Sequence, residues 1–145
     1  MDNTTQPSAG NADAAVVKID TPRFAAHVAR LCKIESIDIK PHSRGGRAWR
    51  RKRLIAIRPI KSEITYAIAL HEIGHILGPR QSGTRLDKEV GAWEWARSNA
   101  IEWTWTMQDQ MQKSLQSYLV WAARSRQAKA PGPDHPINAM CVSHD

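Results

Sequence analysis

The hydrophobic and polar residues of this chain follow mainly a helical period. Between Ser62 and Leu77 the hydrophobic residues recur at helical spacing, Ser62 is a suitable N-cap, and Gly78-Pro79 ends the pattern. A second helical pattern runs from Asp87 to Arg124. Because a helix of that length would be unusual in a small domain, we predict a break near Thr106–Asp109.

The first half of the chain carries shorter patterns. Asp20-Thr21-Pro22 is typical of a helix start, and this helix is expected to continue through residues 23–31. Hydrophobic residues at 34, 37 and 39 predict a first strand, residues 48–58 predict a second, and the glycine-containing segment 41–47 predicts a turn between them. Together these patterns predict an α+β fold that is mainly helical and has a small β-sheet.

Length and composition indicate one modest domain. The chain has 145 residues and a mass of 16.3 kDa. We expect residues 1–20 to be a disordered arm and residues 127–145 an irregular tail, which leaves residues 21–126 as the folded domain. We expect neither a signal peptide nor a membrane span. Cys32 and Cys141 lie far apart and form no C-x-x-C motif, which favours a reduced, cytoplasmic protein.

The segment His71-Glu72-Ile73-Gly74-His75 is an instance of the HExxH pattern and lies within the helix predicted before Gly78. Side chains four residues apart share one face of a helix, so His71 and His75 can bind one zinc ion. Glu72 would then reach a water molecule on that ion. The motif therefore predicts a zinc site with Glu72 as its catalytic residue.

A catalytic zinc ion needs a third protein ligand and an open fourth position. A histidine three residues beyond an HExxHxxG stretch is excluded, because that position holds Gln81. A glutamate on the following helix is the other option, and Glu89 is in register with the predicted core face; Ala92, one turn later, would let the two helices approach closely. Glu94, about 140° around the helix from Glu89, and Glu102 are the alternatives. The expected metal ligands are His71, His75 and Glu89.

Two segments of the chain resemble the ImmA/IrrE-type zinc metallopeptidases of bacteria and their mobile elements. They are residues 69–78, ALHEIGHILG, and residues 89–96, EVGAWEWA. The second segment is similar to that family's E-x-E-A-N-x-F-A motif. Glu89, Ala92 and Ala96 match it, Trp95 stands for the aromatic residue, and Gly91 and Trp93 depart from it. The resemblance covers roughly residues 48–97 and implies a minimal zincin-like core, in which the HExxH helix packs on the glutamate-bearing helix.

The resemblance further implies a metalloendopeptidase of the gluzincin type that cleaves a DNA-bound repressor of a phage or mobile element. In the expected mechanism Zn2+ lowers the pKa of its water toward about 7 and polarises the scissile carbonyl. Glu72 takes the proton of that water and passes it to the leaving amine. Tyr118, His42 and Arg80 are candidates to stabilise the oxyanion, and the edge of the predicted strand at residues 53–58 could bind an extended peptide.

The formal net charge of +7 and the pI of about 9.9 favour acidic partners. A basic segment at residues 44–53 suggests contact with nucleic acid or with an acidic substrate, whereas the alternative is a solubilising loop that protects a strand edge. The competing function is therefore a nucleic-acid-binding or adaptor protein with a non-catalytic metal site. The cations of the basic segment are Arg44, Arg47, Arg50, Arg51, Lys52 and Arg53.

Overall fold

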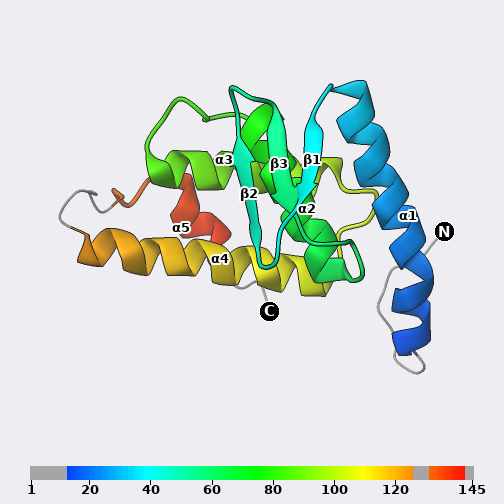
Figure 1. The fold of residues 1–145 in the computed structure, drawn as a ribbon. Helices are drawn as coiled ribbons and strands as arrows, with labels where there is room; N and C mark the ends of the chain where they lie inside the picture. Colours follow the sequence, from blue (N-terminus) through cyan, green and yellow to red (C-terminus); the bar gives the residue numbers. More distant parts are fainter. Residues whose placement is uncertain (1–12, 126–130, 143–145) are drawn as a thin grey trace.

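The computed structural model describes residues 13–125 and 131–142 of the chain, with side chains from residue 21 onward. The predicted α+β class is confirmed, because the fold consists of helices and a small three-stranded sheet that packs on α2 (Figure 1). No described helix is both long and apolar enough to span a membrane. The elements are α1 (Asp13–Ile34), β1 (Asp38–Pro41), β2 (Gly46–Trp49), β3 (Leu54–Ile57), α2 (Glu63–Leu77), α3 (Arg85–Asn99), α4 (Trp105–Arg124) and α5 (Pro136–Met140).

Helix α2 is the centre of the fold and has the bounds that its sequence pattern predicts. Ser62 caps it: the Ser62 hydroxyl accepts from the Thr65 N–H at 3.1 Å, and the Thr65 hydroxyl accepts from the Ser62 N–H at 3.0 Å. Gly78 ends the helix. Helices α1, α3 and α4 and the sheet all pack against α2 (Figure 1). The HExxH motif therefore lies in the most buried helix of the domain.

The sheet differs from the prediction of one strand over residues 48–58. Residues 46–57 form a hairpin instead, in which β2 runs antiparallel to β3, and Arg53 takes a positive φ of 49° in the turn. The order is β1-β3-β2, with β1 parallel to β3. Strand β3 is thus paired on both sides, so the expected peptide-binding edge at residues 53–58 is wrong. The edge strands of the described sheet are β1 and β2.

The break in the long helical region comes earlier than predicted. Residues 100–104 separate α3 from α4, whereas Thr106–Asp109 lies inside α4. Contacts with other elements fix this position: the Ile101 N–H donates to the buried Tyr66 hydroxyl at 3.0 Å, and the Thr104 hydroxyl donates to the Glu63 carboxylate of α2. Thr104 also caps α4. The sequence pattern could not reveal contacts between segments so far apart in the chain.

The ends of the described chain also differ from expectation. Helix α1 begins at Asp13, so the start predicted at Asp20-Thr21-Pro22 is wrong and Pro22 lies inside a longer helix. Residues 1–12 of the expected arm lie outside the described residues. The first strand is also shifted, because Ile34 ends α1 and β1 begins only at Asp38.

The expected irregular tail contains the short helix α5. Its Ile137 is fully buried in the core, and the ring of His135 before it lies 2.7 Å from the Asp87 carboxylate of α3. Burial of Ile137 and Met140 and the contact between His135 and Asp87 therefore hold this segment against the rest of the domain. Residues 127–130 and 143–145 of the expected tail lie outside the described residues, as does residue 126 at the end of the expected domain.

Helices α2 and α3 approach each other at the level of the backbone. A Cβ atom on Gly74 of α2 would lie 2.4 Å from the Ala92 carbonyl oxygen of α3, and one on Gly91 would lie 1.9 Å from the Pro79 carbonyl oxygen. Neither position has room for a side chain. The expected role of Ala92 as a small residue in this interface is confirmed, and Gly91, which departs from the family motif, proves to be required by the packing.

Replacing Gly91 with Ala is expected to lower the free energy of unfolding by about 1–3 kcal/mol, because the clash with the Pro79 carbonyl forces the backbone to move. This value already includes the stabilisation of about 1 kcal/mol that the higher helix propensity of alanine provides relative to glycine. Urea denaturation measures it. Gly132→Ala is the matched control, since nothing lies within 4 Å of its Cβ position. Equal stability of the two variants would contradict the close packing.

Candidate metal centre

Three predicted ligands meet between α2 and α3. His71 Nε2 lies 2.9 Å from Glu89 Oε1, and His75 Nε2 lies 3.0 Å from Glu89 Oε2. The two histidines are one turn apart on α2, and their ring centroids are 4.6 Å apart. Each oxygen of the Glu89 carboxylate therefore faces a different imidazole, and all three side chains point to one place.

Glu72 lies beside this group. Its Oε2 is 3.5 Å from His71 Nδ1, and the residue is 6% exposed. Strand β2 passes directly over it, since a Cβ atom on Gly46 would lie 2.7 Å from Glu72 Cγ and 2.8 Å from its Oε2. Gly46 thus leaves the space that the Glu72 side chain occupies. The sequence pattern predicted only a turn at Gly46, because the contact with Glu72 joins residues far apart in the chain.

The buried charges of this group are coupled. Burial lowers the pKa of His71, but its hydrogen bonds and charge interactions with Glu72 and Glu89 outweigh this effect and raise that pKa to about 9. Burial raises the pKa of Glu89, yet His71 and His75 together lower it to about 2. Two carboxylates thus lie among two imidazoles with little access to water, and the cluster favours added positive charge.

The donor set fits a divalent cation. His71, Glu72 and His75 offer ligand atoms that lie within 4.8 Å of one another, and Glu89 contacts both imidazoles. Imidazole nitrogens with a carboxylate oxygen form the ligand set of many zinc sites. Of the two carboxylates, Glu89 is the one that reaches both histidines, whereas Glu72 contacts only His71.

Gln81 orients His75, a role that the sequence analysis missed. The Gln81 amide nitrogen donates to the carbonyl oxygens of Pro79 and Lys88 at 3.0 and 2.8 Å, so its Oε1 is left to face His75 Nδ1 at 3.0 Å. Because this oxygen can only accept, His75 carries its proton on Nδ1. The free electron pair of a neutral His75 is then on Nε2, which faces Glu89.

Trp93 holds the ring of His71 from the other side. The two rings stack with centroids 4.3 Å apart at an interplanar angle of 12°, and Trp93 is 1% exposed. Trp93 is the second residue that departs from the family motif. Here it fills the core and limits rotation of the imidazole. The spacing of Trp93 on α3 predicted its burial, but its partner lies on another helix.

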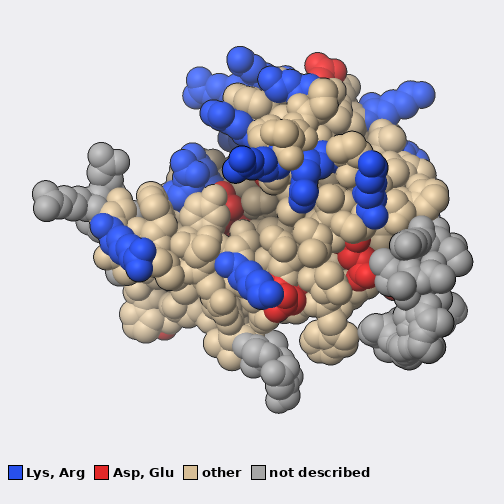
Figure 2. Space-filling view, turned by 60° about the horizontal axis from the view of Figure 1, so that its bottom comes forward, with Lys and Arg blue, Asp and Glu red and all other residues tan. Residues whose placement is uncertain are grey.

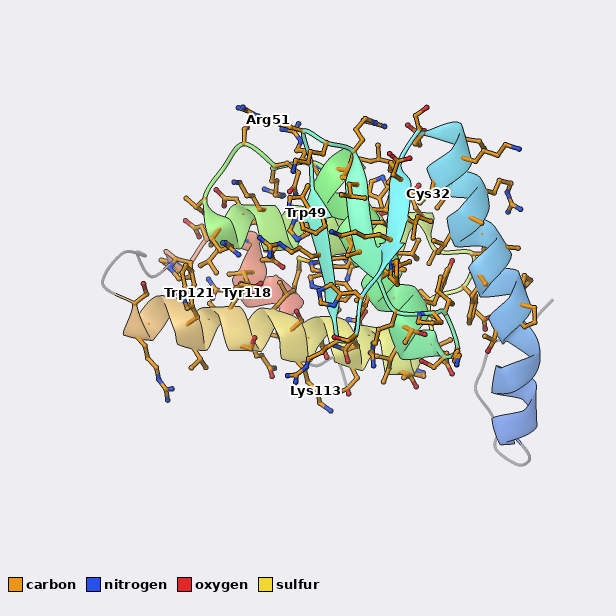
Figure 3. The ribbon with its side chains drawn as sticks, viewed as in Figure 1. Cys32, Trp49, Arg51, Lys113, Tyr118 and Trp121 are labelled. Atoms are coloured by element: carbon orange, nitrogen blue, oxygen red, sulfur yellow. The ribbon has the colours of Figure 1, made fainter. Side chains whose placement is uncertain are left out.

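The group lies at a cleft of about 510 Å³. The cleft is lined by β2 and the turn after it, by α2, by the segment from Gln81 through Glu89, and by Tyr118 of α4. Figure 3 shows Tyr118 rising from α4 toward the level of β2, while Lys113 points away on the opposite side of that helix. Of the three candidates for oxyanion stabilisation, only Tyr118 lines the cleft.

The remaining candidates are engaged elsewhere. Glu94, an alternative third ligand, forms an ion pair with Arg80, whose Nε lies 2.7 Å from Glu94 Oε1. Glu102, the other alternative, lies 3.1 Å from the Arg23 guanidinium. His42 accepts a hydrogen bond from the Arg44 N–H at 3.2 Å. None of these four residues from the sequence analysis, Glu94, Glu102, His42 and Arg80, lines the cleft.

Comparisons with protein families, curated proteins and solved structures find no match to this chain. The resemblance to the ImmA/IrrE-type metallopeptidases thus stays a prediction based on the two quoted segments.

Glu89→Gln is expected to weaken zinc binding by more than about 100-fold, because loss of a hydrogen-bond partner outside the ligand set already costs about 10–100-fold. Titration calorimetry against a competing chelator measures the affinity. Glu94→Gln is the matched control on the same helix and should bind zinc as the wild type does. Equal affinities of the two variants would reduce Glu89 to a hydrogen-bond partner of the histidines.

Gln81→Ala is expected to lower zinc affinity by about 10–100-fold, because it removes the acceptor that fixes the proton of His75 on Nδ1. The same titration checks it, with circular dichroism to confirm folding. Gln112→Ala is the control: the Gln112 amide donates to the Val142 carbonyl far from the cleft. If the two variants bind zinc alike, the His75–Gln81 contact has no bearing on metal binding.

Proposed function

We propose that this protein is a zinc-dependent metallopeptidase. The observation that carries the proposal is the convergence of His71, His75 and Glu89 at the floor of a cleft, with Glu72 beside them. His71, His75 and Glu89 would hold the zinc ion. Glu72, which contacts only one of the imidazoles, is then left for proton transfer. This division of roles is the one that hydrolysis of a peptide bond requires.

Zinc, when bound, would act as a Lewis acid toward the scissile carbonyl and make water more acidic. Glu72 then takes a proton from the attacking water and delivers it to the leaving amine nitrogen. Gly46 and His71 restrict the Glu72 side chain from two sides, which keeps its carboxylate beside the three ligand side chains. The protein thereby supplies a positioned base in a site that excludes most of the solvent.

Tyr118 is our candidate for the donor to the oxyanion. Burial and the charge of Glu89 both raise the pKa of its hydroxyl, although Arg85 opposes them, so the hydroxyl keeps its proton at neutral pH. A protonated phenol can donate a hydrogen bond to the negative oxygen that forms on the carbonyl carbon. Tyr118 enters the cleft from α4, and Glu72 enters it from α2.

The substrate would lie along β2. Of the two edge strands of the described sheet, β1 and β2, it is β2 that lines the cleft, through residues 46–48. An extended peptide can pair with such an edge through main-chain hydrogen bonds, which would lay its scissile bond over Glu72. A DNA-bound repressor remains the target that the family resemblance suggests.

Glu72→Gln is expected to keep its zinc and to lose peptide cleavage by about 100-fold or more, because the amide cannot take the proton of water. Metal analysis and mass spectrometry of a mixed peptide library measure the two properties. Glu94→Gln, an isosteric change outside the cleft, should retain both. Cleavage by Glu72→Gln at the wild-type rate would refute Glu72 as the base.

The competing function is a nucleic-acid-binding protein with a non-catalytic metal site. It is favoured by the side chains around Trp49, since Lys40 Nζ lies 4.7 Å and the Arg47 guanidinium 5.0 Å from its ring centroid. These groups continue the basic segment, and Lys and Arg side chains gather over the upper part of the face in Figure 2. Zinc binding without cleavage by the wild type, together with DNA binding that weakens steeply with salt, would favour this function.

A further inference from the structure

The walls of the cleft carry one sign of charge. Four cations line it from three parts of the chain: Arg47 of β2, Arg50 of the turn that follows, and Arg85 and Lys88 of α3. The carboxylates that line it are Glu72 and Glu89, which lie at the floor against the histidines. Above the floor, the lining is therefore positive on the side of the sheet and on the side of α3.

These four cations have no carboxylate partner among the described residues. The ion pairs of the described chain join other cations, such as Arg53 with Glu35, Arg80 with Glu94 and Lys113 with Asp109. Arg47 lies over the Trp49 ring instead, and Arg85 interacts with the Tyr118 hydroxyl. The cleft thus keeps its positive charge available to a ligand.

Charges of one sign around a cleft focus the electrostatic potential inside it, because the protein walls have a low dielectric constant. We propose that the cleft selects peptides with acidic side chains on both sides of the bond that is cut. This inference rests on the proposed peptidase function and names its substrate class. Arg47 and Arg50 would face acidic residues along β2, while Arg85 and Lys88 would face them across the cleft.

A peptide fits these observations better than a nucleic acid. The free edge of β2 offers main-chain N–H and C=O groups in a row, and an extended peptide is the ligand that pairs with both. An acidic peptide can place its neutral backbone over the floor and its carboxylates against the walls.

The test uses fluorescent peptides of equal length whose neutral centre is flanked by Glu, Gln or Lys. Binding to the full-length Glu72→Gln protein, with zinc, is measured by fluorescence anisotropy. The Glu peptide is expected to bind about tenfold or more tightly than the Gln peptide, and the Lys peptide most weakly. High salt should reduce these differences, because the cations are solvent-exposed.

Charge reversal separates the cleft from the overall charge of the protein. In the Arg50→Glu/Lys88→Glu double variant of the same protein, the preference for the Glu peptide is expected to disappear. Arg30→Glu/Lys33→Glu changes the net charge equally on α1, which lies on the other side of the sheet, and should keep the preference (Figure 1). If both double variants lose the preference for the Glu peptide, the net charge of the protein causes that preference and the inference is overturned.

Cleavage of the same peptides by the zinc-loaded wild type distinguishes the two proposals. Charge-selective binding without cleavage would refute the peptidase function and leave the charge selection standing. Cleavage at equal kcat/KM for the three peptides would overturn the charge selection and leave the peptidase function standing. A single-stranded oligonucleotide serves as competitor. The inference fails if the oligonucleotide displaces the Glu peptide, binds more tightly than that peptide does, and loses this affinity in the Arg50→Glu/Lys88→Glu variant. The cleft would then be a nucleic-acid-binding site.

Discussion

The contact between the backbones of α2 and α3 is the constraint on which the rest of the site depends. Gly74 of α2 lies against the Ala92 backbone of α3, and Gly91 of α3 lies against the carbonyl of Pro79 in the loop after α2; neither position has space for a side chain. This close approach brings Glu89 within hydrogen-bond distance of two imidazoles on the neighbouring helix. A larger residue at either glycine would separate the helices, and the three side chains could no longer meet.

Close packing also sets the electrostatics of the site. Glu89 is 3% exposed, and a carboxylate so deeply buried is costly unless positive groups surround it. The imidazoles of His71 and His75 provide part of that compensation, and a divalent cation would provide more. Trp93 and Gln81 restrict the rotation of these rings from outside the group. The interface between these two helices thus contains a buried group of imidazoles and carboxylates whose geometry could hold a cation.

The remaining parts of the cleft come from segments distant in the chain. The β2–β3 hairpin lays the edge strand over Glu72, and α4 brings Tyr118 to the opposite side. The cations of the cleft come from this hairpin and from the start of α3. Carboxylates thus lie at the floor and cations in the walls, an arrangement that would suit a cation below and an acidic ligand above.

The sequence by itself determined the local features of this protein. The period of hydrophobic residues and the cap at Ser62 define α2, and the spacing of His71 and His75 places both on one face, because these properties depend only on neighbouring residues. The register of Glu89 with the core face of α3 favoured it over Glu94 and Glu102 as the acid that faces the histidines, and Glu89 does contact both of them. Tertiary structure alone decided the hairpin, the break at residues 100–104, and the gathering of Gln81, Tyr118 and the cleft cations around the site. Each of these depends on contacts between residues far apart in the chain, which no local pattern records.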